Sequence, residues 1–369
     1  MSAPHRVTLI PGDGIGPEVV GATRRVLEAT GVAFDWDVQA VGEGPLEALG
    51  TPLPDAVPAS VIANRVALKG PVTAPKVKGF RSVNIGLRRA SGMFGNVRPC
   101  RSYPGVRSRY EDVDVVVVRD VSEDLYAGVE AFAGSPEAEA LVAALRDVLG
   151  VTIADGSGLT IKAISEAASR RIVEYAFDFA RRSGRTRVTA VHKAPVMKAT
   201  DGLFLEVARE VAAANPDIAF DDRAVDIICT QLVQRPQEFQ VLVMPMQYGD
   251  ILSDLCAGLV GGAGMIPGVN VGTDAVLFEP GHGSAPHLAG TDRANPMATM
   301  LSGVLMLRHL GEADAADRLE GAIAAVLAEG RHLTYDQRPR RDDPAAARTS
   351  EVADAVARRL EAGAPVAAR

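Results

Sequence analysis

Cysteines are scarce in this chain, and basic residues are not in excess. The three cysteines, Cys100, Cys229 and Cys256, are too few and too scattered for a disulfide framework, and no two of them form a CxxC motif. A reduced compartment is the simplest interpretation, so we expect a cytoplasmic location. The 39 Lys and Arg residues against 46 Asp and Glu give a net charge of −7, which argues against nucleic acid as a partner.

Long apolar runs are also missing. The most apolar stretches, such as residues 115–118, are far too short to span a bilayer, so we expect no membrane partner. The N-terminus has no charged segment followed by an apolar one, and the sequence therefore predicts no signal peptide. The length of 369 residues exceeds what one simple core usually serves, which favours two lobes.

Short apolar runs alternate with amphipathic segments along most of the chain. They predict strands at 6–10, 66–69, 114–119, 187–192 and 241–244. They predict helices at 17–30, 165–182, 251–259, 296–310 and 350–362. Four consecutive valines at 115–118 indicate a strand covered on both faces. Strands alternating with helices indicate an α/β architecture.

Two acidic residues stand four apart in the segment Tyr248-Gly-Asp-Ile-Leu-Ser-Asp254. On a helix, the carboxylates of Asp250 and Asp254 lie on one face, where they repel each other unless a cation or a proton sits between them. Hard oxygen ligands favour Mg²⁺ or Mn²⁺. The alternative is a pair of acids on a solvated helix face.

Basic residues near strand ends could carry the chemistry of an acidic substrate. Lys193 follows a predicted apolar strand, where a lysine shielded from water can act as a general base, although an ordinary surface lysine is the alternative. Arg88, Arg98 and Arg119 lie near strand or turn signals. Together they suit a multiply charged carboxylate, because guanidinium groups bind carboxylates bidentately, whereas each alone could be a surface residue.

Two polar residues and two loops complete the candidate sites. Ser82 and Asn84 alternate with apolar residues, which predicts that their side chains point to one side together. The glycines of segment 12–16 are spaced G-x-G-x-G and not G-x-G-x-x-G, so a tight strand-to-helix turn competes with a dinucleotide site. The segment from His282 to Pro286, followed by Asn295, could hold a nucleotide or only connect two elements.

Taken in order, these segments resemble the β-decarboxylating dehydrogenases, the isocitrate/isopropylmalate dehydrogenase family. The resemblance runs from residue 9 to the region of residue 333, and it is closest to the NAD-dependent isocitrate dehydrogenases through Ser82-x-Asn84 and the stretch 201–204. The most specific segments are Leu68-Lys-Gly-Pro71, Arg81-Ser-Val-Asn-Ile-Gly-Leu-Arg-Arg89, Asn96-Val-Arg-Pro99, Ala190-Val-His-Lys-Ala194, Tyr248-Gly-Asp-Ile-Leu-Ser-Asp254 and His282-Gly-Ser-Ala-Pro286.

The resemblance implies a fold and an assembly. The fold is a two-lobed α/β subunit of the isocitrate/isopropylmalate dehydrogenase type, not a Rossmann domain. A large domain on the nucleotide side would comprise 1–102 and 263–369, and a small domain with the metal site and the dimer contact would comprise 103–262. In this family Lys193 and Asp226 complete the site of the partner subunit, so we expect a homodimer with shared active sites.

The resemblance also assigns a role to each candidate residue. Lys193 matches the base that takes the hydroxyl proton, and Tyr126 matches the acid that reprotonates the enol after CO₂ leaves. The implied metal ligands are Asp226, Asp250 and Asp254, binding Mg²⁺ or Mn²⁺. The implied substrate contacts are Arg88, Arg98 and Arg119 for the malate-like carboxylates, and Ser82 and Asn84 for the third carboxylate of isocitrate. The implied contacts of NAD, with NADP possible, are Thr73, His282, Gly283, Ser284, Ala285, His287, Leu288 and Asn295.

Several segments depart from the family pattern. The usual Arg-Glu-Asn-(Thr/Ser)-Glu-Gly before the catalytic tyrosine reads here Arg119-Asp-Val-Ser-Glu-Asp-Leu-Tyr126, and the usual Asn before the metal-binding motif is replaced by Met246-Gln247. These changes leave the reaction class in place but open the substrate to homoisocitrate, isopropylmalate or a phosphonate such as phosphonomethylmalate. Two competing hypotheses are a catalytically silent regulatory subunit and a dehydrogenase that does not decarboxylate its substrate.

Overall fold

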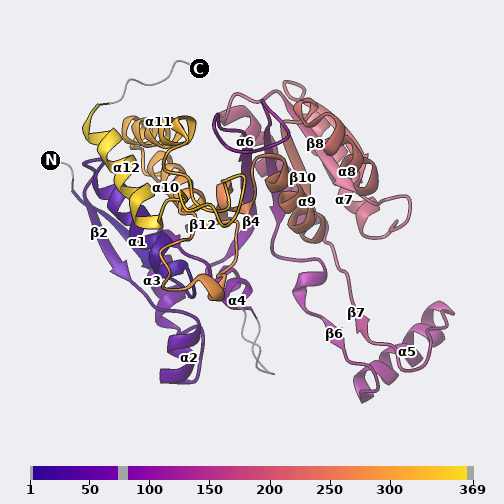
Figure 1. Cartoon of the computed structure of the whole chain (residues 1–369). Helices are drawn as coiled ribbons and strands as arrows, with labels where there is room; N and C mark the ends of the chain where they lie inside the picture. The colour runs from indigo at the N-terminus through magenta and orange to yellow at the C-terminus, as the bar shows by residue number, and fades with distance from the viewer. Residues whose placement is uncertain (1–2, 74–81, 364–369) are drawn as a thin grey trace.

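The computed structural model describes residues 3–73 and 82–363, and within them ten strands form one mixed sheet (Figure 1). Its strand order is β2-β1-β3-β12-β11-β4-β5-β10-β8-β9. Strand β11 is antiparallel to β12 and β4, β4 is antiparallel to β5, and the outer pairs are parallel. The strands are β1 His5–Ile10, β2 Phe34–Val38, β3 Val66–Lys69, β4 Met93–Arg101, β5 Asp114–Asp120, β8 Arg187–His192, β9 Ala219–Ala224, β10 Val241–Met244, β11 Pro267–Gly272 and β12 Val276–Pro280. Antiparallel strands in the middle of the sheet distinguish it from a doubly wound Rossmann sheet.

Helices cover both faces of this sheet. The main helices are α1 Gly16–Glu28, α2 Glu43–Leu49, α3 Ala56–Asn64, α4 Val83–Ala90, α5 Pro136–Leu149, α6 Glu166–Arg182, α7 Asp201–Ala214, α8 Val225–Gln234, α9 Met246–Leu259, α10 Met297–His309, α11 Ala313–Glu329 and α12 Thr349–Glu361. In β5, Val116 and Val118 pack against α6 and α7, whereas Val115 and Val117 pack against α8 and α9. The valine run is therefore buried from both sides, as predicted.

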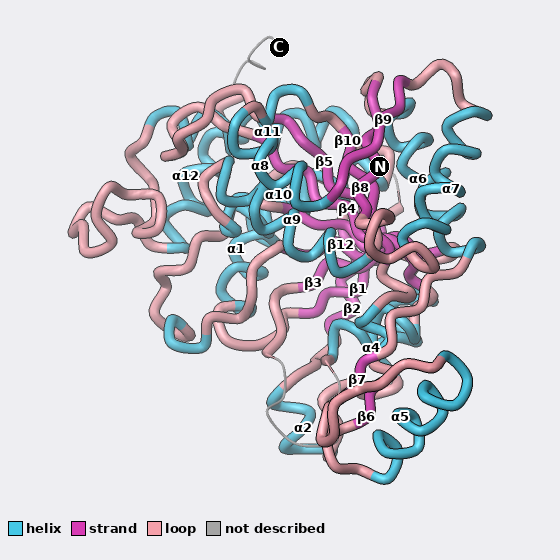
Figure 2. Tube along the Cα trace, turned by 90° about the vertical axis from the view of Figure 1, so that its right-hand side faces the viewer, coloured by secondary structure: helices cyan, strands magenta, loops and turns pink. Residues whose placement is uncertain are grey.

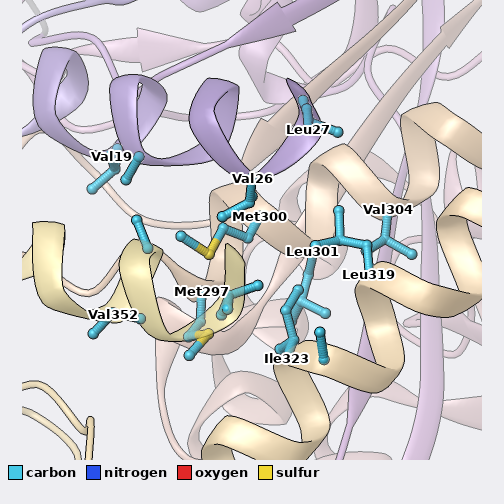
Figure 3. Packing of buried hydrophobic residues seen from close by; sticks show 14 of the residues in the cluster. Val19, Val26, Leu27, Met297, Met300, Leu301, Val304, Leu319, Ile323 and Val352 are labelled. Atoms are coloured by element: carbon cyan, nitrogen blue, oxygen red, sulfur yellow. The ribbon is translucent and has the colours of Figure 1, made fainter. Parts of the chain in front are cut away.

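The two chain ends share one hydrophobic core. Helices α1, α10, α11 and α12 pack together through apolar side chains, among them Val26, Met300, Leu301 and Ile323 (Figure 3). All four side chains are at most 4% exposed. The strands nearest to this core, β1, β3 and β12, also come from the two ends of the chain. This arrangement supports the division at 102/103 and 262/263, which stays a prediction.

Most of the predicted elements are present, but two expectations need correction. Helix α9 begins at Met246 and not at 251, so Asp250 lies inside the helix. Ser82 and Asn84 do not alternate on an extended segment, because Ser82 is the N-cap of α4 and Asn84 is in its first turn. A short run of alternating polar and apolar residues did not distinguish a strand from a helix start.

An arm formed by β6 (Glu130–Ala131), α5 and β7 (Leu159–Thr160) extends away from the main sheet (Figures 1 and 2). The arm exposes large apolar side chains: Phe132 is 76% exposed and Val148 78%. Among the described residues, no helix is both long enough and apolar enough to cross a membrane.

Candidate active site

The centre of the site is a contact between the end of β5, helix α9 and the turn at 125–127. Arg119 Nη1 pairs with Asp250 Oδ1 at 2.5 Å, and the Tyr126 hydroxyl donates to Asp250 Oδ2 at 2.8 Å. Gly249 permits this approach, since a Cβ there would lie 2.3 Å from the Arg119 Cβ. The predicted acid and one predicted metal ligand are thus in direct contact.

Ionisation of this cluster is set by burial and by its charges. Burial raises the pKa of Asp250, but the charge of Arg119 and the hydrogen bonds from Arg119 and Tyr126 outweigh it, so the pKa lies below its ordinary value. Burial, and then the hydrogen bond to Asp250, raise the pKa of Tyr126. At neutral pH we therefore expect an ionised Asp250 beside a protonated Tyr126 hydroxyl.

Three arginines face the same region. Arg98 Nη1 donates to Ser253 Oγ at 2.7 Å and lies 3.2 Å from Asp254 Oδ1. Burial, followed by the charges of Arg98 and Arg88, lowers the pKa of Arg119 to about 10. A site that crowds positive charge in this way favours a polyanion, and it agrees with the predicted clamp for a carboxylate substrate.

A buried polar network holds Arg88 and Arg119 in place, and the sequence did not indicate it. The side chain of Glu279 accepts from Lys69 Nζ, Arg88 Nη2 and Asn270 Nδ2 at 2.8, 2.8 and 2.7 Å. Asn96 then joins Asn270 to Arg119, donating to one at 3.0 Å and accepting from the other at 3.2 Å. These residues lie on the adjacent strands β3, β12, β11, β4 and β5 and on α4. Satisfied buried networks of this kind fix side-chain orientation.

Lys193 and Asp226 form a separate pair within the chain. Lys193 follows β8 as predicted, and its Nζ lies 2.6 Å from Asp226 Oδ1 at the start of α8. Both side chains are partly or largely exposed, at 28% and 63%. Among the described residues, no three His, Cys, Asp or Glu side chains gather in a geometry that would hold a metal. A single chain therefore does not bring Asp226 to Asp250 and Asp254.

The donor chemistry of the three predicted metal ligands nevertheless suits a hard divalent cation. Asp250 and Asp254 stand one turn apart on α9, and their side chains are 43% and 71% exposed. Asp226 adds a third accessible carboxylate on a different helix. Carboxylate oxygens that remain open to solvent are ligands that Mg²⁺ and Mn²⁺ accept.

Loop residues on the nucleotide side also come together. The hydroxyls of Thr73 and Ser284 lie 2.8 Å apart, and Asp13, which the sequence did not single out, accepts from the Thr73 amide at 2.9 Å. Gly14 has a positive φ, and a Cβ there would lie 2.1 Å from the Ser284 carbonyl oxygen. The glycine-rich turn between β1 and α1 therefore allows close packing between the two loops.

A cavity of about 220 Å³ lies beside this turn. Predicted cofactor contacts in its lining are His282, Gly283, Ala285, Leu288 and Asn295. Burial lowers the pKa of His282, and its Nε2 has no hydrogen-bond partner among the described residues. Tyr335 and Asp336 also line the cavity, and Asn295 donates to Asp336 at 3.0 Å. His287 is exposed nearby.

Ser82 and Asn84, the predicted contacts of the third carboxylate, are half-buried at the start of α4, the helix that carries Arg88. The Asn84 Oδ1 atom is buried and has no partner among the described residues. An orphaned polar atom of this kind suits a position that meets a ligand.

Comparison with known proteins identifies the class. The sequence model of the isocitrate/isopropylmalate dehydrogenase family matches residues 6–356, and the chain belongs to this family. It is 44% identical over 337 residues to a probable mitochondrial NAD isocitrate dehydrogenase subunit alpha of Drosophila melanogaster, covering 91% of this chain and 84% of that protein. It is 43% identical over 336 residues to the human mitochondrial NAD isocitrate dehydrogenase subunit alpha, covering 89% and 85%.

Solved structures agree with the family and the fold. The crystal structure of isocitrate dehydrogenase from Methylococcus capsulatus has a TM-score of 0.88 at 46% identity, covering 96% of this chain and 99% of that one. The TT0538 protein from Thermus thermophilus has a TM-score of 0.86 at 39% identity, covering 96% and 68%. The predicted isocitrate/isopropylmalate dehydrogenase fold is confirmed.

Proposed function

We propose that the protein is an NAD-dependent decarboxylating dehydrogenase that oxidises a 2-hydroxy acid of the isocitrate type to a 2-oxo acid and CO₂, with a divalent metal ion. The contact of Arg119, Asp250 and Tyr126 within the field of Arg88 and Arg98 carries this proposal. It supplies a polyanion clamp, a carboxylate and a protonated hydroxyl in one place. The names of the relatives support the same chemistry.

Each residue has a chemical task in this proposal. The arginines hold the substrate carboxylates, while Lys193 removes the hydroxyl proton and Tyr126 returns a proton to the enol carbon. Asp250, Asp254 and Asp226 would hold the metal, which when bound supplies Lewis acidity to the hydroxyl and to the enolate oxygen. The nicotinamide, on the side of Thr73 and Ser284, supplies the hydride acceptor.

The acid and the base argue against a silent regulatory subunit. Tyr126 contacts Asp250 directly, and Lys193 keeps a carboxylate neighbour in Asp226. A panel of 2-hydroxy acids, each with Mg²⁺ or Mn²⁺ and each cofactor, tests the function through the absorbance of reduced nicotinamide and the release of CO₂. The panel comprises isocitrate, homoisocitrate, isopropylmalate and a phosphonate analogue. Reduced nicotinamide without CO₂ would instead indicate a simple dehydrogenase, and no turnover with any acid would contradict the proposal.

The active unit in this proposal is a homodimer, because one chain does not assemble the three carboxylates. Helices α8 and α9, which carry Asp226 and Asp250, also expose apolar side chains: Ile227 is 50% exposed and Ile251 58%. Exposed apolar residues beside an incomplete site support a contact with a second copy.

We predict that sedimentation at assay concentration gives the mass of a dimer. Ile251→Glu, next to Asp250 on α9, should shift the protein toward monomer and lower activity in proportion to the dimer lost. The matched variant Ile62→Glu, at a position 46% exposed on α3, should leave the mass and activity unchanged. A fully active wild-type monomer would contradict the shared site.

For the cofactor we predict NAD over NADP. A 2′-phosphate needs cationic or hydroxyl partners, and Leu288 offers neither. Arg338 is held by backbone carbonyls and Arg340 by Asp342. The remaining candidates are Arg341, which is exposed, and Arg293, which is stacked 5.4 Å from the Tyr335 ring centroid beside the cavity.

The measurement is kcat/KM for both cofactors near pH 8. Arg293→Ala should lower kcat/KM with NADP and leave the value with NAD within about twofold, so the preference for NAD should grow. A wild-type preference for NADP above about tenfold, roughly 1.4 kcal/mol, would overturn the prediction. The cytoplasmic location stays a prediction.

A further inference from the structure

Asp124 has a backbone conformation that is almost restricted to glycine. Its φ is 69° and its ψ is −165°, although its side chain is only about 2% exposed. Asp124 stands directly before the turn that carries Tyr126. Such strain persists only where the surroundings impose it, and it is found most often at functional sites.

The Asp124 carboxylate explains why the conformation is kept. One oxygen accepts from the Leu125 amide at 2.8 Å, and the other accepts from the Gln247 amide at 2.8 Å. Leu125 begins the turn with Tyr126, whereas Gln247 is in the first turn of α9, where unpaired amides and the helix dipole favour an anion. The Asp124 side chain therefore joins the turn that carries Tyr126 to helix α9, which carries Asp250.

The surroundings of Asp124 hold it in this position. Its backbone amide donates to the Ala163 carbonyl at 3.0 Å, and Lys162 Nζ lies 3.7 Å from its carboxylate. Lys162 in turn pairs with fully buried Asp201 at 2.7 Å. Asp201 also accepts from the Tyr248 hydroxyl and from the Lys193 amide, at 2.8 and 2.7 Å. The Asp124 carboxylate therefore has a cationic neighbour, Lys162, whose own position is fixed by Asp201.

We propose that Asp124 is a positioning residue, which fastens the turn at 125–127 to the N-terminus of α9 and so sets the Tyr126 hydroxyl on Asp250. The role of Tyr126 as the acid rests on the proposed function, whereas the positioning itself does not. Asp124 acts through Tyr126 and touches no reacting atom. The same two elements are also joined directly by the 2.8 Å contact of Tyr126 with Asp250.

The variant that separates positioning from folding is Asp124→Gly. Glycine accepts the backbone angles without strain, so the thermal unfolding midpoint should stay within a few degrees of wild type or rise. The loss of both carboxylate contacts should lower kcat at least tenfold. Asp124→Asn keeps the same strained backbone as the wild type but offers one acceptor oxygen instead of two, so its kcat should lie between wild type and Asp124→Gly. Asp112→Gly is the matched control, at an exposed aspartate with φ 57° that is not among the residues of the site.

Two readouts decide the inference. In protein labelled with ¹³C at the tyrosine ring, the Tyr126 resonance, assigned with Tyr126→Phe, should move toward that of a solvent-exposed tyrosine in Asp124→Gly and stay in place in Asp112→Gly. In kinetics, Asp124→Gly combined with Tyr126→Phe should be no slower than Tyr126→Phe alone, because both act through one hydroxyl.

An unmoved Tyr126 resonance, or fully additive rate losses, would overturn the positioning role. The resonance needs no turnover, so it decides the inference even if wild-type protein oxidises none of the acids tested. A wild-type protein that oxidises none of the acids would contradict only the proposed function.

Discussion

Replacing Lys193 by methionine is expected to lower kcat for oxidation of the hydroxy acid by about 10²–10⁴, the usual contribution of a positioned general base. Methionine keeps the length of the side chain and removes the only atom that could take the proton. In the proposed dimer this nitrogen reaches the partner's site, so the loss should appear in both sites of the homodimer. Substrate affinity should change little, because the arginines remain.

The control for this variant is Lys198→Met, an exposed lysine in the same loop. It should retain full activity. If Lys193→Met were as active as Lys198→Met on the best substrate of the panel, Lys193 would not be the base.

Tyr126→Phe is expected to affect the second half of the reaction. Its hydroxyl is the group in contact with Asp250, and phenylalanine removes this hydroxyl with little change in volume. In a single turnover, reduction of the cofactor and loss of CO₂ should continue, while protonation of the enol, which follows the loss of CO₂, should slow by about 10²-fold or more. Single-turnover time courses of reduced nicotinamide and of the 2-oxo acid product measure the two halves, with Tyr175→Phe on α6 as the control. Equal slowing of both halves would contradict separate roles for Lys193 and Tyr126.

The sequence predicted the elements that depend on local periodicity. Strands β3, β8 and β10 have the predicted bounds, because each contains a short apolar run that is buried on both faces. The pair Asp250 and Asp254 was found from spacing alone, although the helix starts earlier than predicted. Periodicity did not identify the start of α9, because Pro245 and the residues that follow it show no apolar repeat of helical period.

The sequence could not show contacts between residues that are distant along the chain. Glu279 lies 191 residues from Arg88, yet their side chains are hydrogen bonded because β12 and β11 lie beside β4, the strand that follows and contacts the helix of Arg88. Similarly, only the backbone angles of Asp124 show that an apparently ordinary acidic residue is strained. The roles of Asp226 and of Ser82 came from the resemblance, since neither has a distinctive spacing.

Removal of the divalent cation is expected to abolish activity. Without it, Asp250 and Asp254 have no cation other than the arginines to balance them, and the substrate hydroxyl and its enolate lose their Lewis acid, which is worth several kcal/mol. Excess EDTA should therefore reduce kcat/KM by about 10³-fold or more, and added Mn²⁺ or Mg²⁺ should restore it. Asp254→Asn should weaken metal binding and raise the Mn²⁺ concentration needed for half-maximal activity, because this largely exposed carboxylate, paired with Arg98, is one of the predicted metal ligands. Asp314→Asn, an exposed aspartate in the first turn of α11, is the matched control and should leave the metal requirement unchanged. Undiminished turnover in excess EDTA would show that Asp250 and Asp254 pair with the arginines and bind no catalytic metal.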